Sequence, residues 1–536
     1  MRVYVGIVAA FLWGCGDDSV GGPADARPPD VLQHDAPPID APMIDAPVID
    51  APVIDAPMID APMPDAQMAD AMIDAAPDAP SPERPCPDAA TPVLDWSRAY
   101  GESYFDTPYG VASDSAGNAV LTGAFYNTIN FGGSPLVDNN IAADDIFVVK
   151  LDPSGAHVWS LRAGGQNSFD YGSAIATDAQ NNVLVAGNTG TGADFGGGPV
   201  TTTGTNNLFL AKLGPTGSHI WSKGFTITPQ SGTTLVNEIL AVATDSTGRV
   251  AIVGHFQGTV NFGGGSIVSS GVGLSEHDVM VAVYDSSGTY LWGGHYGGFD
   301  FDSATGAAFD SAGNLIVAGY FPNTIDFGLG ALNTNNGLDD IFVVKFSPTG
   351  TPLWNHRYGS GAVVQRATTV AVDATGNIAL AGDFGGTIDF GGGTPIMGTP
   401  GNFDVFLAGL DGSGAYRFAE RFGDANEQHA IAVRYAPSGH IVLTGYFRGA
   451  IDFGPCHYVG DANTPRLYAA EFDAGGVPIA SLVVAGSNEV MPRALAITPS
   501  GATLLTGTFD GAFDAGGGLL TSAGQSDIFV LRYSSL

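Results

Sequence analysis

Alternating apolar and polar positions recur along most of the chain in short runs that end at glycine-bearing turns. The first clear unit contains residues 110–114 and 119–125, joined by SAGN, and then residues 146–151 and 157–163, joined by DPSG. Runs of this length and period, with turns of this composition, predict β-strands paired as hairpins. One unit therefore supplies four strands, which we call a, b, c and d in chain order.

The unit recurs seven times at fixed marker positions. Strand d carries Trp96, Trp159, Trp221, Trp292, Trp354, Phe418 and Ala480. Strand b carries Gly123, Gly187, Gly254, Gly319, Gly382, Gly445 and Gly507, and eight residues later come Phe131, Phe195, Phe262, Phe327, Phe390, Phe453 and Ala515. Seven four-stranded repeats of about 62 residues predict a seven-bladed β-propeller.

The two ends of the domain complement each other. Residues around Trp96 form a d-type strand at its start, whereas residues 527–533 form a c-type strand that no d strand follows. We expect the first strand to complete the seventh blade, because this closes the ring and leaves no open sheet edge between its ends. The predicted fold class is thus all-β, a seven-bladed propeller over residues 93–536, and we expect a monomer.

Three stretches of the repeat carry a resemblance to a known family. DDIFVVKLDPSGAHVW (144–159), DSAGNLIVAGYF (310–321) and TIDFGGG (387–393) resemble the bacterial β-propeller repeat family known as SBBP. Blades six and seven depart from this motif at Phe418, Ala436, Ala480 and Thr498. The resemblance covers residues 93–536 and implies a secreted or cell-surface protein, commonly without an assigned reaction.

The first 14 residues have the pattern of a secretory signal, an apolar stretch behind Arg2 that is too short to span a membrane. Residues 12–15, Leu-Trp-Gly-Cys, resemble the lipobox of bacterial lipoproteins, whose cysteine is acylated. The resemblance implies a membrane anchor at Cys15 and a location at the cell outer membrane or cell surface. An ordinary secretion signal cleaved nearby is the alternative.

Residues 15–92 differ in composition from the repeats. They hold half of the chain's 34 prolines, and an aspartate falls at every fifth position from Asp25 to Asp70. Proline at this density forbids a helix, and the few apolar residues cannot offset the entropy of ordering the chain. We therefore expect a disordered, low-complexity stalk that holds the propeller away from its anchor.

Charge and motifs narrow the function classes. The 54 acidic against 19 basic residues give a net charge of −35, which excludes nucleic acid as a partner. The HExxH, GxSxG and P-loop motifs are absent from the sequence, so we expect no enzyme. Lys150, Lys212 and Lys345 recur at one position of strand c, and we expect each to pair with a neighbouring carboxylate. His157 and His219 precede tryptophans on strand d and are interpreted as blade-face residues.

Polar residues recur eight positions before the turn that joins strands a and b. They are Asp106, Asp170, Asn237, Asp302, Gln365 and Gln428, with Val490 in the last unit. Their oxygens suit Ca²⁺ and sugar hydroxyls, so they could form a ligand-binding ring beside the innermost strands; otherwise they cap strand ends and bond loop backbone. A second oxygen-rich cluster, Asp138, Asn139, Asn140, Asp144 and Asp145, invites a Ca²⁺ interpretation but lacks EF-hand spacing.

The leading hypothesis is a non-catalytic propeller that binds an unknown extracellular glycan or protein. The alternative is an extracellular enzyme that acts on polysaccharide or peptide through the same acidic residues. The connections from b to c span 12 to 16 residues and vary in sequence, and we expect them on one face with the d-to-a connections. We call this the long-loop face. An insertion in blade three, residues 226–238, should stand out from it and bias a ligand toward blades two to four.

Cys86 and Cys456 remain after the anchor, in a compartment where disulfides persist. The two could be bridged. The expected strand directions place Cys456 on the long-loop face and residue 93 on the opposite, short-turn face, so the residues after Cys86 would have to climb the side of a blade.

Overall fold

The computed structural model describes residues 92–138, 143–165, 169–204, 206–230, 237–270, 276–334, 337–360 and 363–536. Within these ranges the regular secondary structure is entirely β, and no helix is long and apolar enough to cross a membrane. The propeller belongs to the second of the two units into which the chain divides, Ala76–Leu536. The predicted signal, Cys15 and the stalk lie outside the described residues.

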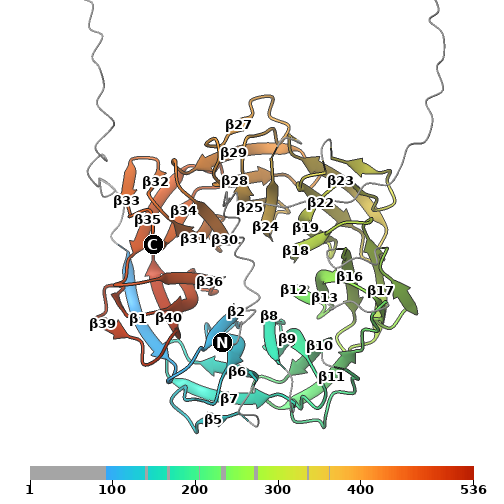
Figure 1. Cartoon of the computed structure of the whole chain (residues 1–536), viewed down its shortest axis with the longest axis vertical. Coiled ribbons are helices and arrows are strands. Elements are labelled where there is room, and N and C mark those ends of the chain that lie inside the picture. The colour runs from blue at the N-terminus through green and yellow to red at the C-terminus, as the bar shows by residue number, and fades with distance from the viewer. Residues whose placement is uncertain are drawn as a thin grey trace, which may run out of the picture. The chain divides into compact units, whose positions relative to one another are not determined.

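Seven four-stranded antiparallel sheets surround a common axis, which confirms the predicted propeller (Figure 1). The a strands are innermost. Blades one to three are β2 (Thr107–Ser113), β3 (Ala119–Phe125), β6 (Asp145–Leu151), β7 (His157–Ala163); β8 (Tyr171–Thr177), β9 (Val183–Thr189), β10 (Asn207–Leu213), β11 (His219–Phe225); and β12 (Glu238–Thr244), β13 (Val250–Phe256), β16 (Asp278–Tyr284), β17 (Tyr290–Tyr296).

The remaining blades repeat the same order. They are β18 (Ser303–Phe309), β19 (Leu315–Phe321), β22 (Asp340–Phe346), β23 (Pro352–Tyr358); β24 (Gln365–Val372), β25 (Ile378–Phe384), β28 (Asp404–Leu410), β29 (Tyr416–Phe422); β30 (Gln428–Tyr435), β31 (Ile441–Phe447), β34 (Arg466–Phe472), β35 (Pro478–Val484); and β36 (Val490–Ile497), β37 (Thr503–Phe509), β40 (Asp527–Ser535), β1 (Val93–Tyr100).

The seventh blade is completed by the first strand, as predicted. Strand β1 pairs antiparallel with β40, from Val93 opposite Ser535 to Tyr100 opposite Ile528. Figure 1 shows this blue strand at the outer edge of the red blade. The contact between the two ends of the domain removes the unpaired edge of β40.

Each b strand needs its mid-strand glycine because strand a bulges against it. In blade one the register shifts between Pro108 and Gly110, which leaves Tyr109 as the extra residue. A side chain at Gly123 would collide with the Thr107 carbonyl and the Phe147 ring. The same shift recurs at the equivalent place in all seven a strands.

The hydrophobic core lies between blades rather than within one compact centre. Seven clusters of buried residues each join two neighbouring blades. The cluster that includes Trp96, Leu121, Phe147 and Ile528, for example, joins blade seven to blade one. Ring closure by β1 therefore completes one of these interfaces as well as one sheet.

The b-to-c connections contain short hairpins, which the sequence analysis did not predict. They are β4 (Thr128–Ile129) with β5 (Leu136–Val137), β14 (Thr259–Asn261) with β15 (Ser266–Val268), β20 (Thr324–Ile325) with β21 (Leu332–Asn333), β26 (Thr387–Ile388) with β27 (Ile396–Met397), β32 (Ala450–Phe453) with β33 (Cys456–Val459), and β38 (Ala512–Asp514) with β39 (Leu519–Thr521). In blade two an isolated bridge joins Asp194 to Pro199.

These hairpins fold back along the outside of the blades, so the prediction that the whole b-to-c connection lies on the long-loop face is wrong. The glycine-rich tip of the first hairpin, at Gly133, lies against His157, the first residue of strand β7 after the short c-to-d turn. Gly197 meets His219 in the same way. His157 and His219 are thus half-buried residues of strand d that support the hairpins.

The hairpin phenylalanine is the physical reason for this direction. Phe131 lies 5.0 Å from the Phe147 ring of its own blade and 5.0 Å from the Tyr100 ring of the preceding blade. Phe327 makes the same contacts with Phe342 and Tyr296. The hairpins therefore fill the wedge that opens between neighbouring blades toward the periphery, and burial of a large aromatic ring there favours the folded-back position.

Candidate functional site

The predicted ligand-binding residues are buried at the long-loop ends of the innermost strands. All six residues are 0 to 1% exposed: Asp106, Asp170, Asn237, Asp302, Gln365 and Gln428. Asp170 accepts backbone hydrogen bonds from Gly165 at 2.7 Å and Gly190 at 2.8 Å, and Asn237 accepts one from Gln257 at 2.7 Å. These contacts tie the d-to-a connection to the end of strand b, which favours the strand-capping interpretation over a ligand-binding ring.

Two of these carboxyls are paired with a second acid at the start of a c strand. A side chain at Gly297 would collide with the carboxyl groups of both Asp302 and Asp278. Burial, opposed by a hydrogen bond from the Gly298 backbone and reinforced by Asp278, raises the pKa of Asp302 to about 8. Two carboxyls this close do not both ionise readily, so the pair tends to retain one proton.

The same arrangement occurs where blade seven meets blade one. Burial raises the pKa of Asp106 to about 7, against hydrogen bonds from the Glu102 and Tyr126 backbone and with a contribution from Asp527. In other blades an amide stands in place of the acid: Gln365 lies near Asp340, and Gln428 near Asp404, around Gly359 and Gly423. The amide nitrogens donate elsewhere: Gln365 Nε2 to the Gly385 carbonyl at 3.0 Å, and Gln428 Nε2 to the Asp424 carboxylate at 2.6 Å.

The recurring lysines form ion pairs with the a-to-b turns, as predicted. Lys150 pairs with Asp114 at 2.6 Å, Lys212 with Asp178 at 2.8 Å, and Lys345 with Asp310 at 2.9 Å. Each lysine also donates to a carbonyl in the c-to-d turn of the next blade. Lys150 and the Trp159 indole both donate to the Pro215 carbonyl, at 3.2 and 3.0 Å. These lysines therefore connect neighbouring blades and have a structural role.

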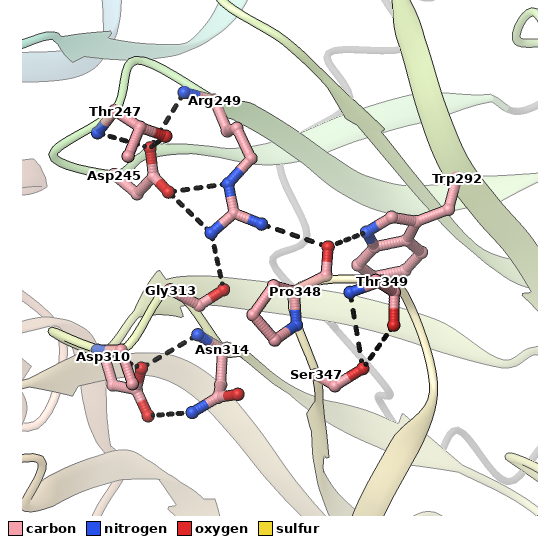
Figure 2. A network of polar contacts seen from close by, with 11 residues as sticks. Asp245, Thr247, Arg249, Trp292, Asp310, Gly313, Asn314, Ser347, Pro348 and Thr349 are labelled. Atoms are coloured by element: carbon pink, nitrogen blue, oxygen red, sulfur yellow. Dashed lines mark hydrogen bonds and ion pairs between the residues drawn. The ribbon is translucent and has the colours of Figure 1, made fainter.

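Blade three lacks the lysine but preserves the connection by another route (Figure 2). Val283 stands at the lysine position, and Arg249 at the start of strand b pairs with Asp245 at 2.7 Å. The same guanidinium donates to the carbonyls of Gly313 at 2.8 Å and Pro348 at 3.1 Å, and the Trp292 indole shares the second carbonyl at 3.2 Å. Blade three thus keeps the connection between its a-to-b turn and the next blade, but an arginine at the start of strand b makes it instead of a lysine on strand c.

The residues that vary most between blades lie at the long-loop ends of strands a and b. Strand a contributes the residue after each capping position, and strand b contributes the residue after each mid-strand glycine. The seven register pairs, which we call the long-loop pairs, are Thr107–Ala124, Tyr171–Asn188, Glu238–His255, Ser303–Tyr320, Arg366–Asp383, His429–Tyr446 and Met491–Thr508. The sequence does contain a signal for these pairs. The residue directly after each mid-strand glycine changes in charge and polarity from blade to blade, whereas the glycine itself is present in every blade.

Contacts link the long-loop pairs of blades three to six. His255 lies 3.1 Å from the Ser303 hydroxyl, and the guanidinium of Arg366 lies 4.7 Å from the centre of the Tyr320 ring. His429 bonds Asp383 at 2.7 Å and stacks on Tyr446 with ring centres 4.8 Å apart. These side chains form a polar, aromatic group around the long-loop end of the axis.

The electrostatics of this group are strongly perturbed by burial. Burial raises the pKa of Glu238 to about 7 and, together with His277, lowers the pKa of His255 to about 3. For His429 burial acts downward, but the Asp383 carboxylate raises the pKa above its ordinary value. Near neutral pH, His255 is therefore neutral and Glu238 is partly protonated. For His429, the Asp383 carboxylate favours the protonated, positively charged form.

Aromatic side chains are exposed on the connections that lead into these strands. Phe299 is 73% exposed, Phe169 58%, Phe105 49% and Tyr104 43%. All four lie in the d-to-a connections of blades one, two and four, directly before the a strands that carry the long-loop pairs. All four rings thus lie at the long-loop end of the scaffold, where a ligand can reach them.

The first part of the blade-three insertion does not stand out from the long-loop face, contrary to expectation. Thr228 pairs antiparallel with Thr259 of strand β14, and Gln230 donates to the Ser269 carbonyl at 3.2 Å. Ile227 is buried in the cluster between blades two and three. Residues 226–230 thus extend the hairpin of blade three, while residues 231–236 lie outside the described part of the chain.

The predicted calcium cluster is only partly described, since Asn139 and Asn140 lie outside the described residues. Burial, with smaller contributions from Asp138 and Asp145, raises the pKa of Asp144 to about 6. Asp145 forms an ion pair with Arg162. No three His, Cys, Asp or Glu side chains of the described segments converge as a metal site requires, so the Ca²⁺ interpretation stays a prediction.

Cys456 is disulfide-bonded. Its predicted partner Cys86, like Cys15, lies outside the described residues, so the pairing stays a prediction. The expected position of Cys456 was wrong: it opens strand β33 beside the hairpin tip at Gly454, which lies against Pro478 at the start of a d strand. Because the hairpin folds back, Cys456 is near the short-turn end, where residue 93 also begins its strand.

Comparison with known proteins supplies no function for this chain. No family model matches the chain. An uncharacterized WD repeat-containing protein of Acanthamoeba polyphaga mimivirus is 22% identical over 519 residues, covering 78% of this chain and 36% of the relative, so the chain spans about a third of that protein's length. Among solved structures, Sqt1 from Chaetomium thermophilum matches at 12% identity and a TM-score of 0.35, covering 83% of this chain and 99% of that one. The chain is thus similar in sequence to a WD repeat-containing protein, while its propeller fold is shown by its own seven sheets.

Proposed function

We propose that this chain is a bacterial surface lipoprotein of the SBBP type whose propeller is a non-catalytic binding module. The observation that carries the binding role is the exposed aromatic group on the d-to-a connections, above the long-loop pairs. Aromatic faces beside charged and hydroxyl groups are the combination that binds sugar rings and peptide segments. The ligand class is therefore an extracellular glycan or protein.

The contacts of the candidate acids support a non-catalytic role. The enzyme alternative relied on acidic residues of the long-loop face, and Asp106, Asp170 and Asp302 are buried and bonded to loop backbone. A glycosidase pair needs two carboxyls that reach a substrate in an open pocket. No observation favours the enzyme alternative over a binding module.

The anchor part of the proposal rests on residues 1–92 alone. The lipobox-like Leu12–Cys15 supports acylation, and the proline-rich stalk supports display at a distance from the membrane. The proposed location is the outer membrane or the cell surface.

The binding role is tested with the full chain on glycan arrays and cell-envelope fractions, with and without a chelator. The variant Phe169→Ala/Phe299→Ala should lose binding and keep the wild-type melting temperature, because both rings are exposed. The control Leu353→Ala/Met397→Ala removes two side chains of similar exposure from a d strand and a hairpin, and it should bind normally. Equal binding by both double variants would show that the recognition surface does not include Phe169 and Phe299. Loss of binding in the presence of the chelator would support the Ca²⁺ interpretation.

The anchor is tested separately. Wild-type protein should partition into the detergent phase, whereas Cys15→Ser should remain unprocessed or soluble. Equal partitioning of the two would contradict lipidation and leave the binding role untouched.

A further inference from the structure

One carboxylate of the inner strands is not used by the fold. Glu238 opens strand β12, the innermost strand of blade three, and is the one acid among the strand-a members of the long-loop pairs. It is half-buried, and within the described residues no hydrogen bond or ion pair reaches its carboxylate. The capping acid Asp302, by contrast, accepts a bond from the Gly298 backbone.

The surroundings of Glu238 supply no compensating charge. Burial alone raises the pKa of this carboxyl to about 7, and no described arginine or lysine opposes it. Its register partner His255 is neutral near pH 7, and Arg366, which covers the Tyr320 ring, already pairs with Asp339. A confined carboxylate without a counter-charge is costly to ionise, so a bound cation would offset that cost.

Tyrosines from three other blades lie near this carboxylate. Its charge raises the pKa values of Tyr171 in blade two, Tyr320 in blade four and Tyr109 in blade one. The rings of Tyr109 and Tyr171 contact each other, with centres 5.6 Å apart. Blades one and three are not neighbours, so the effect of Glu238 on Tyr109 indicates that the carboxylate faces the axis, where strands β2, β8 and β12 meet (Figure 1).

This group offers hydrogen-bond acceptors and aromatic faces. Tyr109 and Tyr171 are half-buried, and in the described part of the chain neither phenol oxygen has a hydrogen-bond partner. A primary ammonium carries three N–H donors and no acceptor, which matches one carboxylate and two phenol oxygens in number. The faces of tyrosine rings also attract cations. The chemistry of the group therefore fits an ammonium.

The position of the group favours a lysine side chain over the amine of a sugar. The exposed Phe169 and Phe299 lie on the connections before β8 and β18, the inner strands on either side of β12. Lysine carries its charge on four methylenes, which can pack on such rings while the ammonium reaches a half-buried acid. A sugar amine is attached directly to a broad ring and has no such reach. The net charge of −35 attracts basic ligands in addition.

We propose that the long-loop end of the axis binds a lysine side chain of a protein ligand, with the Glu238 carboxylate as counter-charge and Tyr109 and Tyr171 as acceptors and ring faces. This inference rests on the proposed binding function and names the group that the surface recognises. Glu238 then determines specificity, while the exposed phenylalanines supply apolar contact.

The test is isothermal titration calorimetry of the full chain with a capped Gly-Lys-Gly peptide at about pH 8.5, where the carboxylate and the ammonium are both charged. A peptide with norleucine in place of lysine keeps the methylenes, and it should bind about tenfold more weakly or less. Glu238→Gln should weaken binding of the lysine peptide to the same extent, and Tyr171→Phe should weaken it less. Glu420→Gln, the same substitution at an exposed position of the outer strand β29, is the charge-matched control and should bind normally.

A pH series isolates the carboxylate. Glu238 takes up a proton as the pH falls from about 8.5 to 6, so wild-type affinity for the lysine peptide should fall over this range. The other titratable groups that face it do not change charge there: His255 stays neutral, and burial keeps the pKa values of Tyr109, Tyr171 and Tyr320 above the range. Glu238→Gln should therefore show no such fall.

The outcomes separate a binding role from a structural one. Loss of lysine-peptide binding in Glu238→Gln, with a melting temperature at about pH 8.5 no lower than that of wild type, supports the site. A lower melting temperature of this variant would show that the fold uses the carboxylate, and peptide binding that persists in it, or is absent in wild type, overturns the site. Tighter binding of glucosamine than of the lysine peptide would assign the group to an amino sugar instead.

Failure of this site is distinguishable from failure of the proposed function. Envelope or glycan binding that survives Glu238→Gln but is lost in Phe169→Ala/Phe299→Ala would overturn the lysine site and leave the binding module in place. Loss of both the envelope binding and the peptide binding in Glu238→Gln, at unchanged stability, would support the two together.

Discussion

Two sets of basic residues in this propeller differ in what surrounds them. At the short-turn ends of the blades, Lys150, Lys212 and Lys345 each hold an aspartate and a carbonyl of the next blade. On the inner strands of the described residues, Arg434 donates to the Val433 carbonyl at 2.8 Å, and Arg493 has the Glu489 carboxylate as a neighbour without forming an ion pair. The first set repeats with the blades and the second does not. A charge that recurs with the repeat stabilises the scaffold, whereas a charge found in one blade alone is not required by the repeat.

The largest expected effect comes from breaking the ring itself. Deletion of residues 93–100 removes β1 and exposes the edge of β40, so the domain should lose most of its stability, on the order of 5 to 15 kcal/mol for a folded domain. Hydrogen exchange should show lost protection in β40 and β37 before β3 and β6. Deletion of eight residues from the predicted stalk, 51–58, is the control and should change nothing. Uniform loss of protection around the ring would contradict a closure that acts through blade seven.

A smaller effect is expected from one of the repeated ion pairs. Burial alone would raise the pKa of Asp178, but hydrogen bonds from Lys212 and Asn182 lower it below its ordinary value. Lys212→Met leaves the buried Asp178 carboxylate without its cation. The substitution should lower the free energy of unfolding, measured by chemical denaturation, by about 3 kcal/mol. Lys223→Met, an equal substitution on the outer strand of the same blade, should cost less than about 1 kcal/mol. Similar costs for the two would mean that the repeated pair adds no more than an outer-strand lysine.

The smallest effect concerns the paired acids and appears only with pH. The pKa of Asp302 is raised to about 8, so the folded state binds a proton that the unfolded state releases above about pH 4. Stability should therefore fall as pH rises from about 4 through 8. Asp302→Asn, which copies Asn237 of blade three, should flatten that fall and raise the melting temperature at pH 9 by on the order of 2 °C.

Asp326→Asn is the matched control for this pH effect. It removes an acid from an exposed hairpin tip, where its oxygen accepts a bond from Gly328 that an amide can also accept. Its pH profile should follow wild type. A flattened profile in the control would assign the effect to net charge instead of the buried pair.

Repetition made most of the scaffold predictable. Because each marker residue occurs in seven copies, the positions that the fold requires can be distinguished from positions occupied by chance. The blades, the closure by β1 and the lysine–aspartate pairs could therefore all be predicted from the sequence. The hairpins of two to four residues per strand could not, because such short pairings depend on the aromatic wedge around Phe131 more than on local alternation. That error also misplaced Cys456.

The candidate sites also include some residues that the sequence could indicate and others that it could not. The six polar residues from Asp106 to Gln428 were recognised as a ring, but residue type alone could not distinguish a ligand from a strand cap, because a carboxylate serves both. The long-loop pairs were missed, although their offset from the mid-strand glycine was visible. The departure of Arg434 from the alanines of the other six blades was also missed, because it shows only when the blades are aligned by register.

By itself, the sequence determined the number of blades, their strand order and the way the ring closes, because each depends on local periodicity that recurs along the chain. The tertiary structure decided which acids are buried, which way the hairpins fold and which cations hold a partner. Those properties depend on distances between residues of neighbouring blades about 60 positions apart, as in the contact of Lys150 with Pro215. Desolvation and pairing of a charge are set by such neighbours, and no local pattern of the chain contains them.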